Sequence, residues 1–394
     1  MKSRALLIQQ GHVFAPEPLG IQDILIINEN IAAIGSSLDM PEWCDGPAIS
    51  AKGHLVFPGF VDQHVHLAGG GGEGGPQFRT PEISLTALTT AGVTTAVGVL
   101  GTDGTTRSVS GLLATARGLE AQGLSTSIYT GAYEVPTRTI TDTPRNDVVL
   151  IDKVIGIGEI AVSDHRGSHP SDRSLAQLAS EARVGGLLSG KAGVLHLHLG
   201  SGPRKLEPVY EVLGMADIPI DTFVPTHLNR NHALLEDAVK LGQRGGWLDL
   251  TTGIVPTSDD KDAVDAATAM IFLKDHGVRW NHVSFSSDAE GSAPVFDAEG
   301  RLISMDMGSA NTLWQAVLAL GHQGVSWDRA IQPVTSTPAD ILKFSRVGRL
   351  RPGSIGHIVM IRDETISKVV AKGRLMVDEG RPIVFGTYEK ASSR

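Results

Sequence analysis

The sequence predicts an α/β fold, a TIM-type (β/α)8 barrel joined to a small β-sandwich that both chain ends build together. Between residues 59 and 345, short Val/Ile/Leu-rich runs alternate with Ala/Leu-rich helical stretches. About eight such repeats form a closed parallel barrel. The flanking segments instead carry short apolar runs broken by Gly, Asn and Pro, which is typical of strands joined by turns. We therefore expect a discontinuous β-domain (1–58 plus 346–394) and a catalytic barrel (59–345).

The expected elements follow one another without a long linker. Strand candidates of the end domain are residues 5–14, 23–35, 54–59, 357–363, 366–377 and 382–386. Barrel strand candidates after the FPGFV run (57–61) are residues 94–100, 126–133, 153–164, 192–200, 221–229, 246–253 and 283–288. Helices are expected within residues 84–92, 109–123, 174–190 and 232–246, where Ala and Leu recur at helical spacing.

Composition excludes several classes of function. The chain has 394 residues and a net charge of −9, whereas a nucleic-acid partner requires a basic footprint. No run of about 18 apolar residues occurs, so we expect no membrane span. The first residues carry too short an apolar run for a signal peptide, and the single cysteine, Cys44, fits a reducing compartment. We expect a cytoplasmic protein.

The strongest chemical signal is Asp62-Gln63-His64-Val65-His66, which follows the apolar FPGFV run. Because side chains alternate along a strand, His64 and His66 project from one face and can bind one metal ion. Further candidates close later apolar runs, where barrels place their active sites: His198, His227 and Asp288. Such a set predicts a metal centre.

One tetrahedral zinc ion binds four ligands, and five candidates are present. We therefore expect two zinc ions with a carboxylate between them. Glu159 is the candidate bridge because it lies inside the apolar run VIGIGEIAV, where an unpaired carboxylate is costly. Lys153 begins the same strand, far from the chemistry. His196 and His198 both point inward, and His198 is preferred as the ligand because it is closer to the strand end.

Several longer motifs resemble the isoaspartyl (β-aspartyl) dipeptidases of the amidohydrolase superfamily. They are PGFVDQHVHLAGGGGEGGPQFRTPE (58–82), LGTDG, TGAYEVPTRTIT, SDHR, PTHLNRN and SSDAEGS, with TSTPADILKF and GRLRPGSIGHIVMI near the end. The resemblance covers nearly the whole chain. It implies that two zinc ions are bound by His64, His66, His198, His227 and Asp288, and that the substrate is a dipeptide.

The resemblance also implies the remaining roles. Asp288 would take a proton from the bridging hydroxide and pass it to the leaving amine, and Tyr133 would donate to the scissile carbonyl oxygen. Glu73 would pair with the substrate's α-ammonium group, while Arg166 and Arg230 would hold its carboxylates. Three further residues would line the substrate pocket: Gly71, Thr102 and Ser292. A homo-oligomer is implied too, with an octamer as one candidate form.

The chain departs from this family at the metal bridge. Better-known members use a carboxylated lysine, in a strand that resembles VIGVK, whereas Glu159 stands in this chain. Glutamate is shorter, so the strand must approach the metals, and we expect a bulge at Gly158 to achieve this.

Two other functions stay open at this point. One is an amidohydrolase acting on another bond, either a cyclic amide, as in dihydroorotases and hydantoinases, or an N-acyl amino acid. Metal ligands cannot separate these activities, but Glu73 and the two arginines favour a zwitterionic dipeptide. The other is a catalytically silent scaffold, which would be expected to lose ligands that this chain retains.

Overall fold

Both chain ends contribute to one β-sheet in the computed structural model, which describes residues 2–258, 260–296 and 301–390. The sheet has ten strands, β1 (Ser3–Phe14) to β6 (Leu55–Pro58) and β17 (Ile358–Arg362) to β20 (Arg381–Pro382). The strands between these are β2 (Pro18–Ile27), β3 (Asn30–Gly35), β4 (Cys44–Asp45), β5 (Ala48–Ser50), β18 (Thr365–Ala371) and β19 (Arg374–Asp378). The path runs β20-β19-β18-β17-β6-β1-β2-β3, and β4 and β5 pair with β1.

This end sheet differs from the expected sandwich of two sheets because it is continuous. β1 pairs with β5 through Leu7–Gln9 and with β6 through His12–Val13. This long strand therefore connects β2 and β3 with β6 and the C-terminal strands β17–β20. The N-terminal and C-terminal strands share an apolar core that includes Ile24 and Ile26 of β2 and Met360 of β17. Backbone hydrogen bonds from Ile31 to Ser354 (2.8 Å) and from Gly356 to Glu29 (2.7 Å) hold β3 against the segment before β17.

The central part of the chain is of the TIM-barrel type. Six parallel strands form one sheet in the order β12-β11-β10-β9-β8-β7, and β13 pairs in parallel with β14. Their bounds are β7 (Phe60–Val65), β8 (Val93–Gly98), β9 (Ser125–Thr130), β10 (Val154–Val162), β11 (Val194–Leu199), β12 (Phe223–Thr226), β13 (Leu248–Thr251) and β14 (Val283–Ser286). Hydrogen bonds from Leu228 to Asp249 (3.3 Å) and from His66 to Ala289 (2.9 Å) connect the two groups of strands.

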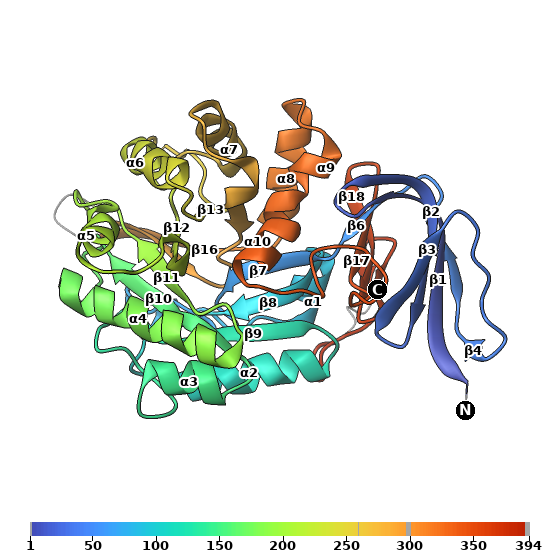
Figure 1. The fold of residues 1–394 in the computed structure, drawn as a ribbon, viewed down its shortest axis with the longest axis horizontal. Coiled ribbons are helices and arrows are strands. Elements are labelled where there is room, and N and C mark those ends of the chain that lie inside the picture. The colour runs from blue at the N-terminus through green and yellow to red at the C-terminus, as the bar shows by residue number, and fades with distance from the viewer. Residues whose placement is uncertain (1, 259, 297–300, 391–394) are drawn as a thin grey trace.

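Helices cover the outside of these strands, and the end sheet lies to one side of the molecule (Figure 1). They are α1 (Leu85–Thr90), α2 (Val109–Ala121), α3 (Pro144–Leu150), α4 (Asp172–Ser189), α5 (Glu207–Met215), α6 (His232–Gln243), α7 (Ala266–Asp275), α8 (Thr312–His322), α9 (Trp327–Ala330) and α10 (Ser336–Ile341). Every residue of β7 to β14 is buried except Ser125 and Ser127 of β9, which are half-buried, as expected where helices cover a parallel sheet. The main apolar core lies between strands and helices.

A short antiparallel hairpin follows β14 and was not predicted from the sequence. Its strands are β15 (Ser292–Phe296) and β16 (Leu302–Met307). Gly74 approaches this hairpin closely, because a Cβ atom at Gly74 would lie 2.6 Å from Leu302 Cδ2. The hairpin therefore packs on the glycine-rich segment that carries Glu73.

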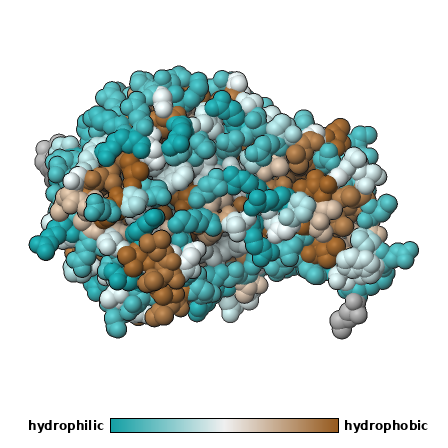
Figure 2. Space-filling model, in the orientation of Figure 1, coloured by the Kyte–Doolittle hydropathy of each residue, from teal (hydrophilic) through white to brown (hydrophobic). Residues whose placement is uncertain are grey.

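The outer surface in Figure 2 is mostly hydrophilic, with brown apolar patches over α4 and over the end sheet. The patch on α4 includes Leu187 and Leu188, which are 65% and 67% exposed. None of the helices in the described part of the chain is both long enough and apolar enough to cross a membrane.

Candidate active site

The predicted metal ligands lie at or near the C-terminal ends of the barrel strands. His64 lies in β7 and His66 directly after it, while His198 belongs to β11. His227 and Asp288 follow β12 and β14 in left-handed backbone conformations, with φ of 62° and 55°. Each local turn thereby directs its side chain back over the barrel mouth.

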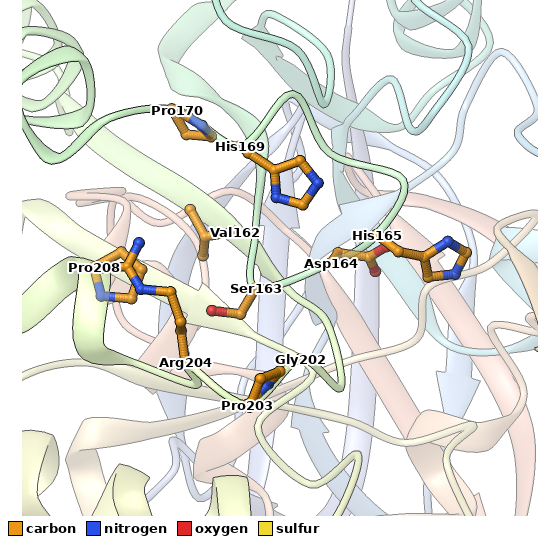
Figure 3. Close-up of a pocket in the computed structure, with 10 residues that line it drawn as sticks. All are labelled: Val162, Ser163, Asp164, His165, His169, Pro170, Gly202, Pro203, Arg204 and Pro208. Carbon is orange, nitrogen blue, oxygen red and sulfur yellow. The ribbon is translucent and has the colours of Figure 1, made fainter. Parts of the chain in front are cut away.

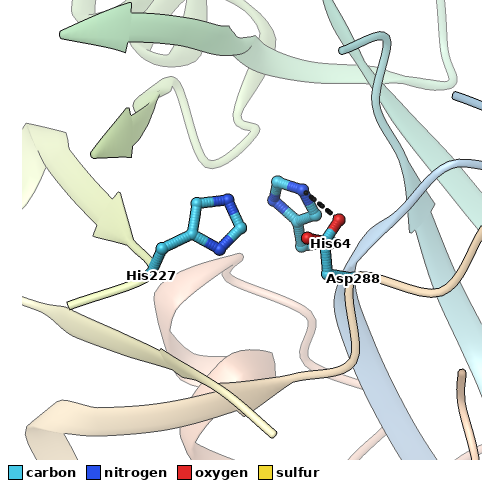
Figure 4. Close-up of side chains that lie close together, drawn as sticks. All are labelled: His64, His227 and Asp288. Atoms are coloured by element: carbon cyan, nitrogen blue, oxygen red, sulfur yellow. Dashed lines mark ion pairs between the residues drawn. The ribbon is translucent and has the colours of Figure 1, made fainter. Parts of the chain in front are cut away.

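Glu159 is the centre of this cluster. Its Oε1 lies 3.5 Å from His66 Nε2, and its Oε2 lies 3.5 Å from His64 Nε2, 3.3 Å from His198 Nδ1 and 3.8 Å from His227 Nε2. Asp288 Oδ1 lies 3.3 Å from His64 Nε2 and 3.0 Å from His66 Nε2. Figure 4 shows His64 and His227 converging on Asp288.

Three overlapping groups of ligand atoms within this cluster can each hold a metal ion. They are His64 with His66 and Glu159, Glu159 with His198 and His227, and His64 with His227 and Asp288. Glu159 is common to the first two groups. A carboxylate shared in this way has the placement that a bridge between two ions requires.

The donor atoms also fit a metal because they lack other partners. His64 Nε2, both carboxylate oxygens of Glu159 and Asp288 Oδ1 are buried and make no hydrogen bond to any described residue. Buried polar atoms are otherwise almost always hydrogen-bonded, and a buried carboxylate without a partner is costly. Metal ions held by these residues would satisfy the four atoms.

The electrostatics of the cluster favour carboxylates in their ionised form. Burial alone would raise the pKa of Glu159, but His64, His198 and His227 hold that pKa well below its usual range. Burial opposes protonation of His64 as well, yet Glu159 and Asp288 raise the pKa of His64 to about 9. In His227 burial dominates and lowers the pKa to about 3. The cluster therefore holds negative charge that attracts a cation.

The strand that carries Glu159 is bulged where the sequence predicted it. Ile157 pairs with Leu195 and Ile160 with Leu197, so three steps along β10 face two steps along β11. Gly158 occupies the bulge with φ of 154°, and a Cβ atom there would lie 2.7 Å from the carbonyl oxygen of His196. The extra residue aims Glu159 into the barrel, and only glycine fits beside it.

Replacing Gly158 is consequently expected to destabilise the protein. Gly158→Ala forces a methyl group against the His196 backbone and should lower the free energy of unfolding by about 1–3 kcal/mol. Urea denaturation measures this change. Gly118→Ala is the matched control: it lies in α2 with open space around the added methyl group, and should stabilise by up to about 1 kcal/mol. Equal stability of the two variants would contradict the close packing of the bulge.

His196 and His198 have different surroundings. His198 Nδ1 faces Glu159, whereas His196 Nε2 lies 2.7 Å from His64 Nδ1 and its ring stacks on Tyr129 at a centroid distance of 4.8 Å. Among the described residues, the groups that can share an ion include His198 and do not include His196. The geometry favours His198 as the ligand and gives His196 the position of a support for His64.

Most of the predicted substrate residues gather around Glu73. Its carboxylate accepts hydrogen bonds from Thr102 Oγ1 (2.9 Å) and Ser292 Oγ (3.0 Å), and it lies 3.2 Å from Arg166 Nη1. Gly71 has φ of 72°, and a Cβ atom there would lie 3.3 Å from Ser292 Cβ. A cavity of about 470 Å³ borders Gly71, Glu73 and Thr102. Glu73, predicted to bind a substrate ammonium group, and the three residues predicted to line the pocket thus lie together on one wall.

The other predicted residues lie around His198 and the strand end that carries it. The Tyr133 hydroxyl is 2.8 Å from His198 Nδ1, and Arg166 stacks over the Tyr133 ring at 5.5 Å. Arg230 donates from Nε to the carbonyl oxygen of Leu199 (3.1 Å), and its terminal nitrogens have no hydrogen-bond or ion-pair partner within the described ranges. Burial and the nearby Arg166 lower the pKa of Arg230.

The sequence analysis missed two residues that contact the predicted ligands. Asp164 Oδ2 lies 2.9 Å from His198 Nε2, and Thr251 Oγ1 lies 2.7 Å from His227 Nδ1. Asp164 stands in the SDHR motif directly after a barrel strand, which was a usable signal. Thr251 ends the buried strand β13 with nothing in its neighbours to distinguish it.

Comparison with known proteins agrees with this geometry. A family model described as the amidohydrolase family matches residues 55–376. The chain belongs to the amidohydrolase family. This match confirms the sequence-based expectation of a hydrolytic, metal-binding family, and the barrel mouth described above is where that family's site would lie.

Solved structures extend the comparison to nearly the whole amidohydrolase chain. The β-aspartyl dipeptidase of Fervidobacterium islandicum AW-1, in complex with a β-Asp-Leu dipeptide, is 36% identical, with a TM-score of 0.89 over 96% of this chain and 98% of that chain. A second structure of that enzyme is 34% identical, with a TM-score of 0.86 and the same coverage. These values confirm the predicted resemblance to the isoaspartyl dipeptidases.

Other relatives are more distant or shorter in extent. A D-hydantoinase structure is 18% identical, with a TM-score of 0.69 over 99% of this chain and 98% of that chain, which shows a shared fold alone. The dihydroorotase of Staphylococcus aureus (strain Mu50) is 40% identical over 89 residues, 23% of this chain. The chain spans about a fifth, 20%, of that relative's length.

Proposed function

We propose that this amidohydrolase hydrolyses isoaspartyl (β-aspartyl) dipeptides, with two zinc ions held between His64, His66, Glu159, His198, His227 and Asp288. The observation that carries the proposal concerns the terminal nitrogens of Arg230, near Asp164 and Asp288. They have no hydrogen-bond or ion-pair partner among the described residues. Arg230 is half-buried, so an anionic ligand group is the natural complement of these nitrogens. An isoaspartyl dipeptide carries two free carboxylates and one ammonium group, which matches Arg166, Arg230 and Glu73.

The similarity to a β-aspartyl dipeptidase structure that holds β-Asp-Leu supports the same substrate class. In the proposed complex, Glu73 binds the α-ammonium group, with Thr102 and Ser292 fixing its carboxylate. Arg166 and Arg230 bind the free carboxylates and so place the β-amide carbonyl over the cluster. Gly71 lines the same wall without occupying space that the substrate needs.

Bound zinc would supply Lewis acidity and bring the pKa of a coordinated water close to ~7. The protein's own residues then handle the protons. The Asp288 carboxylate accepts a proton from the attacking water and transfers it to the leaving amine, as general base and then general acid. The Tyr133 hydroxyl stays protonated because burial raises its pKa well above the usual value, so it can donate to the carbonyl oxygen as charge develops there.

A panel of substrates tests the proposal. Purified protein, loaded with zinc, is assayed against β-aspartyl and α-aspartyl dipeptides, dihydroorotate, a hydantoin and an N-acyl amino acid. We expect turnover of the β-aspartyl dipeptides at least about 10²-fold above the others in kcat/KM, because only they carry two carboxylates and an ammonium group in the arrangement that places a β-amide over the cluster. Preference for a cyclic amide or an N-acyl amino acid would replace the proposal with that activity.

Arg230→Lys is expected to impair the enzyme nearly as much as Arg230→Ala. Arg230 Nε is committed to Leu199, and the two terminal nitrogens form a fork that one ammonium group cannot copy. Both variants should lose about 2–5 kcal/mol of transition-state stabilisation for a β-aspartyl dipeptide. The value of kcat/KM should therefore fall at least about 30-fold. Arg117→Lys, at a side chain 59% exposed, is the control that should leave kcat/KM unchanged. Near-complete activity of Arg230→Lys would exclude bidentate binding.

Three further expectations stay predictions. They are the division into domains 1–58 plus 346–394 and 59–345, a cytoplasmic location and a homo-oligomeric state. Analytical ultracentrifugation measures the last directly.

A further inference from the structure

The Asp164 carboxylate is saturated with hydrogen bonds. Its Oδ1 accepts from the backbone N–H of Arg166 (2.8 Å) and from Arg166 Nε (3.0 Å). Its Oδ2 accepts from Arg166 Nη2 (2.7 Å) and lies 2.9 Å from His198 Nε2. A carboxylate offers about four acceptor positions, so all of them are in use. Asp164 is only 6% exposed, which keeps water from competing for them.

The contact with His198 fixes which ring nitrogen faces the cluster. His198 Nδ1 lies 3.3 Å from Glu159, so Nδ1 is the nitrogen available to a metal ion, and Nε2 carries the proton that Asp164 accepts. Histidines that bind metals commonly donate their second N–H to a carboxylate, which fixes the tautomer and the ring orientation.

The contact with Arg166 fixes which edge of the guanidinium group faces the substrate wall. Asp164 occupies Nε and one N–H of Nη2, so the Nη1 side remains and reaches Glu73 at 3.2 Å. The guanidinium plane lies over the Tyr133 ring at 5.5 Å. Asp164 holds one edge of the guanidinium group and the Tyr133 ring covers one face, so Arg166 presents its Nη1 edge to a ligand.

Close packing of the surrounding backbone holds Asp164 in this position. Gly200 packs against it so closely that a Cβ atom there would lie 2.5 Å from Asp164 Cβ, and Gly202 N–H donates to the Ser163 carbonyl oxygen (2.7 Å). A cavity of about 340 Å³ lies beside this wall, and the Asp164 side chain points away from the Arg204 and Pro208 side of it (Figure 3). The carboxylate therefore belongs to the catalytic cluster.

We propose that Asp164 is a positioning residue that orients the metal ligand His198 and the substrate-binding Arg166 through a single carboxylate. Its part in substrate binding rests on the proposed dipeptidase function, whereas its part in metal binding does not. Because one group supports both side chains, its loss impairs metal binding and substrate binding together. Arg166 Nη2 also lies 3.1 Å from His198 Nε2, so loss of Arg166 impairs mainly substrate binding and affects metal binding less than loss of Asp164 does.

Asp164→Asn tests this proposal because the amide keeps the shape but cannot accept four hydrogen bonds. Zinc affinity of the apo-protein, measured by competition with a chromophoric chelator, should fall about 10- to 100-fold. At saturating zinc, KM for a β-aspartyl dipeptide should rise by a larger factor than kcat falls. Arg166→Ala should raise KM and lower zinc affinity by a smaller factor than Asp164→Asn does, because Asp164 keeps its direct contact with His198. Adding Asp164→Asn to Arg166→Ala should then raise KM no further.

Asp340→Asn is the matched control, because Asp340 also accepts two hydrogen bonds from an arginine, Arg349 (2.7 and 2.8 Å), away from the cluster. It should change neither quantity. Wild-type zinc affinity in Asp164→Asn would overturn the link to His198, and independent effects on KM would overturn the link to Arg166. If thermal unfolding shows that Asp164→Asn does not fold, Asp164→Ser repeats both measurements. A wild-type protein inactive on β-aspartyl dipeptides would refute the proposed function, while the zinc measurement would still decide the role of Asp164.

Discussion

Asp288→Asn is expected to lower kcat on a β-aspartyl dipeptide by about 10²–10⁴-fold, the range that general acid–base catalysis contributes. An amide of the same shape cannot accept the proton that the Asp288 carboxylate is proposed to carry. Asp288 is suited to that role because its side chain is 20% exposed and its Oδ1 has no hydrogen-bond partner among the described residues. Burial raises the pKa of Asp288, but its contacts with His64 and His66 hold that pKa well below the usual range, so the carboxylate is ionised.

The same substitution should leave the substrate site in place. Asp288 has φ of 55°, and asparagine adopts this left-handed conformation as readily as aspartate does. Calorimetric titration of zinc-loaded Asp288→Asn with the dipeptide should therefore still show binding. Asp363→Asn is the matched control, because Asp363 has φ of 48° and is 94% exposed far from any predicted ligand.

Metal content has to be measured in the same samples, since Asp288 is also a proposed ligand. Asp288→Asn that holds full zinc and retains near wild-type kcat would remove the proton-transfer role. If it loses zinc, saturating zinc should restore the metal but not turnover.

The sequence predicted that the candidate metal ligands would lie close together, because they obey strand geometry. His64 and His66 share one face of β7, while His198, His227 and Asp288 all lie where a barrel strand ends, and parallel strands bring such positions together. The bulge at Gly158 was predictable for a related reason. A glutamate in place of a longer side chain leaves a gap that one extra residue in the strand can close.

Pairings between distant segments could not be predicted in this way. Asp164 contacts a histidine 34 residues away, and nothing within SDHR distinguishes a residue that binds substrate from one that holds its neighbour. The continuity of the end sheet depends on β1 pairing with both β5 and β6, a choice set by packing. The hairpin β15–β16 was missed because its apolar residues lie on an exposed element, where hydrophobic periodicity is weak.

Glu159→Gln is expected to reduce zinc affinity by more than the 10- to 100-fold typical of a residue outside the first coordination shell. Glu159 lies within 3.8 Å of nitrogens on all four predicted histidine ligands, so a neutral amide removes the charge that two dications would share. The change is nearly isosteric at a fully buried position, and thermal unfolding of the apo-protein checks that the variant folds. Zinc affinity is measured by chelator competition, as for Asp164.

The decisive comparison separates a glutamate bridge from a carboxylated lysine. A lysine carbamate forms only from dissolved CO2, so an enzyme that uses one depends on bicarbonate during metal reconstitution. Apo-protein reloaded with zinc in CO2-depleted buffer should regain full zinc content and full activity, and added bicarbonate should change neither.

Lys153 supplies the internal control, because it is the nearest lysine on the same strand and was the alternative bridge. It lies six positions before Glu159, roughly 20 Å along a strand, and its Nζ donates to the Thr126 carbonyl oxygen (2.9 Å) and pairs with Glu120. Lys153→Gln should therefore bind zinc with wild-type affinity. Bicarbonate-dependent reconstitution of the wild type, together with zinc loss in Lys153→Gln, would transfer the bridge to Lys153. With Glu159 as the bridge, two negatively charged oxygens come directly from the chain, and assembly of the metal centre requires only the folded protein and zinc.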